Sequence, residues 1–238
     1  MTWTISPIWQ QSYFNIVKQA LKSPTIFDTF RSHVDYNAIV TNCMTKEEFE
    51  IYTEELDKIP DAVSKLETLK QMDIIGLQNE GPSPRNLRYL YNAFRIKENF
   101  GEIKTVVEIG VGYGGMCFTM GNIFDIIGYR LIDIDCVVEL ARLFLSKLPT
   151  VCSDFSPDPP YDLCISECSL TELDDYSIQS YYNKYLIQSQ HLFIRTNFRQ
   201  PERLHNFINM IEQDFTTKMT TDFPDPDQPK TVMFGWKK

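Results

Sequence analysis

The feature that most constrains the fold is the alternation of strand-like and helix-like segments after residue 100. Residues 104–109 form a short apolar run that predicts a buried strand, and apolar residues then recur at helical spacing from Met116 to Ile127. This alternation continues to residue 211, and two strand-like segments without a helix between them follow. The predicted strands are 104–109, 129–134, 150–153, 161–166, 190–196, 215–223 and 231–236.

Strands that alternate with helices form a parallel sheet, because each crossover helix returns the chain to the same edge. The last two strands, which lack a crossover helix, predict an antiparallel edge. We therefore predict an α/β protein with a doubly wound, seven-stranded, mostly parallel sheet. Before residue 100, apolar stripes at helical spacing predict helices, so we expect an N-terminal helical region over 1–99 and a ligand-binding domain over 100–238.

A glycine-rich turn, with Gly110, Gly112, Gly114 and Gly115, follows the first predicted strand. Glycine has no Cβ and lets the backbone approach a ligand, and ligands of open α/β sheets bind beyond the carboxyl ends of the strands. Asp133 ends the next predicted strand, where a carboxylate can accept hydrogen bonds from ribose hydroxyls. The loop and the acid together predict a site for a ribose-containing cofactor.

Two cofactor classes fit this loop. Gly110, Gly112 and Gly115 satisfy the G-x-G-x-x-G pattern of an NAD(P)-dependent oxidoreductase. Two further acids favour a different class: Glu108 precedes the loop, and Asp154 follows the third predicted strand, where it is expected to accept from an adenine amino group. Asp133 or Asp154 alone is more often a solvated strand-end or cap residue. Their positions at successive strand ends carry the prediction.

These segments resemble the class I S-adenosylmethionine-dependent methyltransferases, and most closely their sugar O-methyltransferase family. The similar segments are Val106–Cys117, Tyr129–Arg142, Asp162–Leu173 and Gly81–Tyr89, within a stretch from roughly residue 75 to 238. The resemblance implies a Rossmann-like methyltransferase fold, S-adenosyl-L-methionine as cofactor and a sugar-like small molecule as methyl acceptor. It also implies that Glu108 lies near the methionine amino group and that Ser166 contributes to the cofactor site. An inactive protein with this fold is the other alternative, which the presence of all the acids disfavours.

Methylation of a hydroxyl calls for a positioned base. Glu167 and Glu172 follow the fourth predicted strand and are the candidates. Glu172 is equally typical of a carboxylate at a helix N-terminus, and Glu167 could hold the cofactor instead. Arg88 is expected either to contact the cofactor carboxylate or to be a solvated arginine. No metal site is predicted, because the acids at the strand ends are assigned to the cofactor.

Charge and hydropathy limit the partners. The net charge of −9 disfavours nucleic acid, since a negative field repels phosphate groups. No apolar run reaches the roughly 18 residues of a membrane span, and the first residues lack the pattern of a secretion signal. We therefore expect a cytoplasmic protein that acts on a small molecule without a membrane. The helices before residue 100 are expected to form a lid over the acceptor, or else a homodimer interface.

Overall fold

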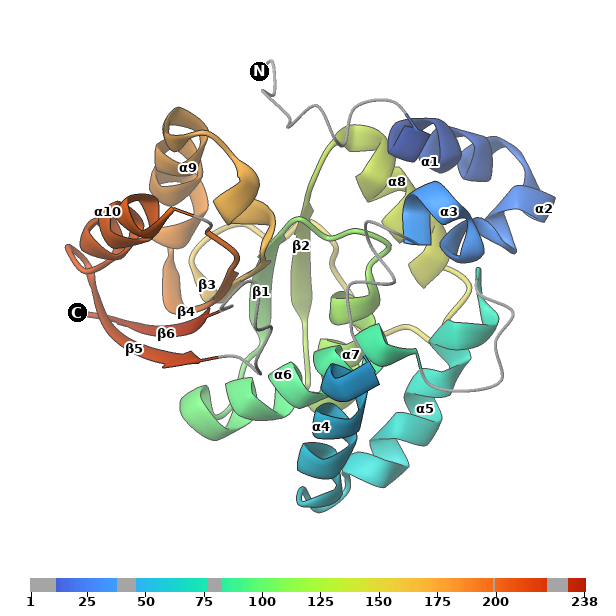
Figure 1. Ribbon diagram of the computed structural model, residues 1–238, viewed down its shortest axis with the longest axis horizontal. Coiled ribbons are helices and arrows are strands. Elements are labelled where there is room, and N and C mark those ends of the chain that lie inside the picture. Colours follow the sequence, from blue (N-terminus) through green and yellow to red (C-terminus); the bar gives the residue numbers. More distant parts are fainter. Residues whose placement is uncertain (1–11, 38–45, 77–82, 199, 222–230) are drawn as a thin grey trace.

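The computed structural model describes residues 12–37, 46–76, 83–198, 200–221 and 231–238. Within them, six strands form one mixed sheet in the order β2-β1-β3-β4-β6-β5 (Figure 1). The strands are β1 (Thr105–Ile109), β2 (Gly128–Ile132), β3 (Tyr161–Glu167), β4 (Ser189–Thr196), β5 (Phe215–Thr221) and β6 (Thr231–Lys237). The helices after residue 100 are α7 (Gly115–Ile123), α8 (Asp135–Leu145), η4 (Ser169–Glu172), α9 (Asp175–Tyr181), η5 (Tyr182–Leu186) and α10 (Pro201–Ile211).

The predicted α/β class and the antiparallel edge are confirmed. Strands β1 to β4 pair with one another in parallel, and each of the first three is followed by a helix on the way to the next strand. Strand β6 runs antiparallel to both β4 and β5. The reversal follows from the missing crossover helix between the last two strands.

The prediction of seven strands is wrong for the described residues, because the segment 150–153 forms no strand. The following residue, Asp154, forms only an isolated parallel bridge with Gly128 among the described residues. The Tyr129 amide donates to the Asp154 carbonyl oxygen at 2.8 Å, and the Asp154 amide donates to the Ile127 carbonyl oxygen at 3.2 Å. Two prolines, Pro159 and Pro160, follow closely and offer no amide proton to a ladder.

Helices cover both faces of the sheet, as a doubly wound topology requires. Neighbouring side chains of a strand point to opposite faces, and the two faces carry separate apolar clusters. Val106 and Leu163 belong to the cluster that includes α6, α7 and α8, whereas Val107 and Cys164 pack with α9, η5 and α10. Figure 1 shows α9 and α10 on the opposite side of the sheet from α6 and α7.

The chain before residue 100 is helical wherever it is described. The long helices agree with the prediction of helices from apolar stripes, and three short ones were not predicted because a single turn leaves no periodicity to detect. These elements are α1 (Ser12–Lys22), α2 (Pro24–Phe27), η2 (Phe30–Ser32), α3 (Val34–Tyr36), α4 (Lys46–Asp57), α5 (Ala62–Ile74) and α6 (Pro84–Phe100). Their buried residues share one apolar cluster with α7 and α8, in which Tyr13 and Leu69 belong together with Phe118 and Phe144.

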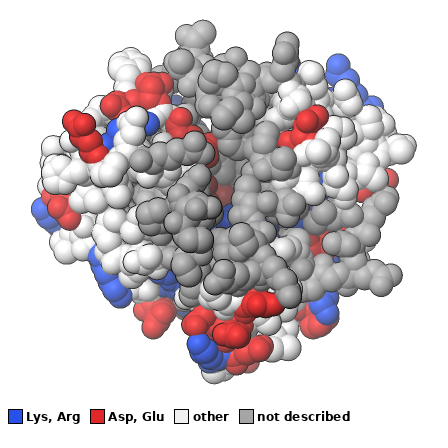
Figure 2. Space-filling view, viewed as in Figure 1, with Lys and Arg blue, Asp and Glu red and all other residues white. Residues whose placement is uncertain are grey.

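The surface of the described residues carries both signs of charge. Figure 2 shows acidic and basic side chains interspersed around one face, with no continuous basic band among the atoms coloured there. No helix within the described residues is long and apolar enough to cross a membrane.

The contact between α7 and the segment that replaces the seventh strand generates a stability prediction. A Cβ on Gly121 would overlap the Val151 side chain and lie 2.6 Å from the Val151 carbonyl oxygen. Gly121→Ala should therefore lower the free energy of unfolding by about 1–3 kcal/mol, the usual cost of overpacking, despite the better helix propensity of alanine. Urea unfolding measures the change.

The control is Asn122→Ala on the same helix. Asn122 is half-buried, and its side-chain amide donates only to the Phe118 carbonyl oxygen of its own helix. We expect a change of about 0.5 kcal/mol there. Equal stability of Gly121→Ala and the wild type would show that segment 151–154 is not held against α7.

Candidate functional site

The register of the parallel strands brings the predicted residues to one edge of the sheet. Ile109 lies opposite Ile132, and the Gly110 amide donates to the Ile132 carbonyl oxygen at 2.8 Å, so Gly110 and Asp133 leave their strands side by side. Glu167 lies opposite Arg195 at the same end of β3 and β4. This carboxyl edge is where open α/β sheets bind ligands.

The glycines of the loop are required by protein packing. Gly110 has φ +84°, and a Cβ there would overlap the Ser169 side chain. A Cβ on Gly115 would lie 2.6 Å from ring atoms of both Tyr113 and Tyr89. Close approach of a ligand was the expected reason for these glycines, and the structure adds a second reason: neighbouring side chains occupy the space that a Cβ would need.

Asp133 is joined directly to the loop. One of its oxygens accepts from the Ile134 amide at 2.8 Å, and the other accepts from the Gly112 amide at 3.4 Å. Burial raises the pKa of Asp133 to about 6, and hydrogen bonds from Ile134, Gly112 and Val111 offset part of this effect. The glycine loop and Asp133, the residue predicted to bind the ribose, are therefore joined by a direct hydrogen bond.

Glu108 lies beneath the loop and is almost completely buried, with 3% of its surface exposed. The Tyr129 hydroxyl donates to its carboxylate at 2.7 Å. Burial holds the pKa of Glu108 well above its usual range, while the Tyr129 hydrogen bond lowers it and the charges of Glu167 and Asp133 raise it further. These acids lie close enough to repel one another, so a cation at this edge would be stabilised.

Glu167 is held by two side chains of α6. Arg88 pairs with Glu167 at 3.1 Å, and the Asn92 amide donates to the other carboxylate oxygen at 2.8 Å. Arg88 is 2% exposed, so the prediction of a solvated arginine is wrong. Asn92 was not predicted, although it stands one helical turn after Arg88; its buried Oδ1 has no hydrogen-bond partner among the described residues.

Glu172 lies at the end of η4, where Asn197 meets it from the end of β4. The Asn197 side-chain amide donates to the Glu172 carboxylate at 3.1 Å. Burial raises the pKa of Glu172, whereas Asn197 and the charge of Arg85 lower it. The N-cap of the next helix, α9, is Asp174, which accepts from the Ser177 amide. Ser166, fully buried, accepts from the Leu170 amide at 3.1 Å and so anchors η4.

The prediction that Asp154 points into the same site is wrong. Asp154 bridges Gly128, the first residue of β2, whereas Asp133 follows the last. Asp133 stands five residues beyond Gly128, which is about 16 Å at the rise of a β-strand. Asp154 is exposed, and its carboxylate accepts from the Ser156 amide at 2.8 Å. The physical reason is the backbone pairing with Gly128, which holds this segment beside the start of β2.

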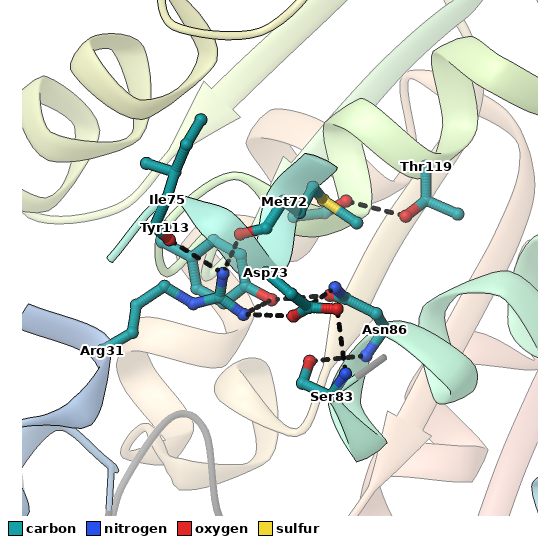
Figure 3. A network of polar contacts seen from close by, with 9 residues as sticks. Arg31, Met72, Asp73, Ile75, Ser83, Asn86, Tyr113 and Thr119 are labelled. Carbon is teal, nitrogen blue, oxygen red and sulfur yellow. Dashed lines mark hydrogen bonds and ion pairs between the residues drawn. The ribbon is translucent and has the colours of Figure 1, made fainter. Parts of the chain in front are cut away.

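A buried polar network supports the loop from the N-terminal side, and sequence reasoning missed it. Figure 3 shows Arg31 surrounded by Asp73, Tyr113 and the carbonyl oxygens of Met72 and Ile75. Tyr113 is the residue between Gly112 and Gly114 of the loop. The one available signal was Asp73, a charged residue inside the apolar run Met72–Ile75.

Two other features lie away from this edge. A hollow of about 320 Å³, lined by Ile16, Ile26 and His33 among others, opens between α1 and η2, and His33 is exposed there. Over the described part of the chain, no group of three His, Cys, Asp or Glu side chains is arranged to hold a metal ion.

Comparisons with known proteins bear on the fold. No protein-family model and no curated protein sequence match this chain. Solved structures of methyltransferases do match. The methyltransferase domain of bacterial CtHen1 has 14% sequence identity and a TM-score of 0.51, and the match covers 63% of this chain and 98% of that one. N-methyltransferase NodS from Bradyrhizobium japonicum, in complex with S-adenosyl-L-homocysteine, has 14% identity and a TM-score of 0.52, and the match covers 73% of this chain and 98% of that one. A protein from Klebsiella pneumoniae assigned as an O-methyltransferase is also similar, with 13% identity and a TM-score of 0.51; the match covers 83% of this chain and 99% of that one. The chain therefore has the fold of these methyltransferases.

The ion pair between Arg88 and Glu167 generates a second stability prediction. Arg88→Met should lower the free energy of unfolding by about 3 kcal/mol, because it leaves the Glu167 carboxylate buried without its cation. Glu167→Gln should also destabilise, and the double variant should lose less than the sum of the two single variants. Urea unfolding of the four proteins gives the coupling energy.

Arg203→Met is the control for this cycle. Arg203 pairs with the exposed Asp175 at 2.8 Å, and such a pair contributes about 1 kcal/mol or less. If Arg88→Met lowered the free energy of unfolding no more than Arg203→Met does, the ion pair of Arg88 with Glu167 would be accessible to water in solution.

Proposed function

We propose that the chain is an S-adenosylmethionine-dependent methyltransferase that methylates a hydroxyl group of a sugar-like small molecule. The observation that carries the proposal is the direct bond between the glycine loop and Asp133, through the Gly112 amide, at the carboxyl edge of a methyltransferase-type sheet. The complex of the similar NodS structure with S-adenosyl-L-homocysteine supports the cofactor class.

The charge of the edge favours this cofactor over a dinucleotide. Glu108, Asp133 and Glu167 lie around the loop, and the latter two raise the pKa of the first. A dinucleotide would bring its pyrophosphate to the loop, against three carboxyl groups. S-adenosylmethionine instead carries an ammonium and a sulfonium, which these acids attract.

The residues fit the parts of the cofactor. Asp133 would accept from the ribose hydroxyls while it keeps the loop amides in place, and Glu108 would face the ammonium group from beneath the loop. Arg88 would supply a cation at the end of β3 for the methionine end of the cofactor. Asn92 Oδ1, which has no hydrogen-bond partner among the described residues, would supply an acceptor. When bound, the cofactor supplies an activated methyl group. Gly114 and Gly115 would contribute to cofactor binding through the shape of the loop, and Ser166 would contribute through the shape of η4.

Glu172 is the better candidate for the base. Glu167 already pairs with Arg88 and Asn92, whereas Glu172 has one side-chain donor, Asn197. A base works best when its pKa is near the working pH, and burial moves the pKa of Glu172 in that direction. The Glu172 carboxylate would accept the proton of the acceptor hydroxyl. The methyl group would then pass from the sulfonium sulfur to the hydroxyl oxygen, with S-adenosyl-L-homocysteine as the leaving group.

The resemblance to sugar O-methyltransferases supports the acceptor class. The net charge of −9 supports a small-molecule partner over nucleic acid. The helices before residue 100 share the apolar core of the sheet, which supports a covering role over the acceptor, with a homodimer as the alternative.

Calorimetric titration tests the cofactor. S-adenosylmethionine should bind, and Asp133→Ala should weaken binding by about 1–3 kcal/mol through the loss of charged hydrogen bonds. Because the pKa of Asp133 is about 6, the ionised form that hydroxyl donors prefer is depleted below that pH. The affinity of the wild type should therefore fall as the pH is lowered through 6, and Asp133→Ala should lose this dependence.

Asp154→Ala is the matched control, since it removes an acid at the opposite edge of the sheet. It should leave the affinity unchanged. Binding of NAD(P) without any response to S-adenosylmethionine would favour an oxidoreductase and end the proposal. Binding without transfer to any sugar or related hydroxyl compound would point to an inactive protein.

The base is tested on an acceptor found by screening sugars with labelled cofactor. Glu172→Gln should lower kcat by about 10²- to 10⁴-fold, the usual contribution of a general base, and leave cofactor affinity nearly unchanged. In the wild type, kcat should fall as the pH drops through the raised pKa of Glu172. This acidic limb should disappear in Glu172→Gln.

Two further variants complete the test. Glu167→Gln should weaken cofactor binding more than it lowers kcat, because Glu167 orients Arg88 and Asn92. Asp175→Asn, an exposed acid at the start of α9, should change neither quantity. Full turnover in both Glu172→Gln and Glu167→Gln would rule out a carboxylate base.

A further inference from the structure

Arg31 is the only arginine among the described residues whose entire surface is buried; its exposed fraction is 0%. Its guanidinium lies 4.2 Å from the centre of the Tyr113 ring and donates to the Tyr113 hydroxyl at 3.3 Å. It pairs with Asp73 at 3.4 Å and donates to the carbonyl oxygens of Met72 and Ile75 at the end of α5. The arginine thus joins η2 and α5 to the glycine loop (Figure 3).

Stability alone does not account for this arrangement. Burying an ion pair costs about as much desolvation energy as the pair returns, and apolar residues of similar volume are often as stable. The fork of an arginine does, however, fix directions: it can stack on a ring and hold several acceptors at the same time. The geometry of this site is therefore better explained by a role in fixing the position of Tyr113.

Tyr113 is held from two further sides. Its hydroxyl donates to the Asn86 side chain at 3.1 Å, and its ring meets Phe144 edge-on at 5.0 Å. Asn86 in turn donates to Asp73 at 2.8 Å, which closes a cycle through Arg31. The cycle is fully buried, so its hydrogen bonds do not compete with water.

Small displacements of Tyr113 would also displace the neighbouring residues that are proposed to bind the cofactor. The preceding residue, Gly112, donates its amide to Asp133, and the following residue, Gly114, donates to the Val111 carbonyl oxygen at 2.9 Å. Gly114 has φ +89° and Gly112 has φ +53°, left-handed conformations that other residues rarely adopt. The glycines allow this backbone shape, and a separate contact is needed to select it.

We propose that Arg31 is a positioning residue for the cofactor: by clamping Tyr113, it holds the Gly112–Gly114 backbone and Asp133 in the geometry that binds the ribose. The proposal rests on the proposed function for its ligand. It gives the helices before residue 100 a part in cofactor binding, in addition to any role over the acceptor.

The test compares three variants by two readouts in the full chain. Arg31→Met removes the charge and the donors, Arg31→Lys keeps the charge without the fork, and Tyr113→Phe keeps the ring without the hydroxyl. One readout is the Kd for S-adenosyl-L-homocysteine by calorimetry, well below each Tm. The other is hydrogen exchange of the loop amides without ligand, in particular that of Gly114.

Arg31→Met should raise the Kd by about 10-fold or more, Arg31→Lys and Tyr113→Phe should raise it less, and the order of exchange rates at Gly114 should follow the order of Kd. Phe207→Leu is the control for lost stability, because Phe207 packs in the cluster on the opposite face of the sheet. At a Tm matched to that of an Arg31 variant, it should leave both readouts unchanged.

Three outcomes decide the proposal. A lower Tm with an unchanged Kd and unchanged Gly114 exchange in all three variants would make Arg31 purely structural and overturn it. If Arg31→Met does not fold, Arg31→Lys and Tyr113→Phe still supply both readouts. If the wild type binds no S-adenosyl compound, the proposed function fails, while faster Gly114 exchange in the variants would still support the clamp.

Discussion

The contact between the Arg31 guanidinium and Tyr113 is the interaction on which the arrangement of the rest of the molecule depends. It lies where η2, the end of α5, the start of α6 and the glycine loop meet. A cation can be buried there only because a carboxylate, two carbonyl oxygens and an aromatic face surround it. Segments more than 80 residues apart in the sequence are consequently fixed relative to one another.

This constraint changes how the helices before residue 100 should be understood. A lid that opens and closes would need a small, separable interface with the sheet domain. Here α1 packs on α8, and α5 and α6 pack on α7, within one apolar cluster. Motion of these helices as a unit would break that cluster and expose Arg31, which disfavours a lid that moves as a whole.

Local patterns in the sequence predicted the elements that depend on local physics. The apolar runs of β1 to β4, the glycine loop and the acid after β2 were found because strand periodicity and turn residues are visible within a few positions. The prediction placed Asp154 at the wrong edge of the sheet, because its position along β2 depends on the pairing of its backbone with Gly128. No local pattern in the sequence encodes this pairing. Arg31, Asn86 and Asn92 were missed for the same reason: their side-chain partners lie 13 to 82 residues away.

The concentration of acids at the carboxyl edge follows from the alternation of side chains along the strands. In β1, Val106 and Glu108 share a face, and in β3, Leu163, Ile165 and Glu167 continue the same face. Both acids therefore point towards α6, and the parallel register sets them near Asp133. Only one cation, Arg88, is paired with them by a described ion pair. Burial raises the pKa of Glu108, and Glu167 is paired with Arg88, so the negative charge near neutral pH rests mainly on Asp133, whose pKa is about 6. In this buried setting its interaction with a ligand is stronger than in water. The Asp133 carboxylate therefore opposes an anionic cofactor and favours one that carries its reactive group on a cation.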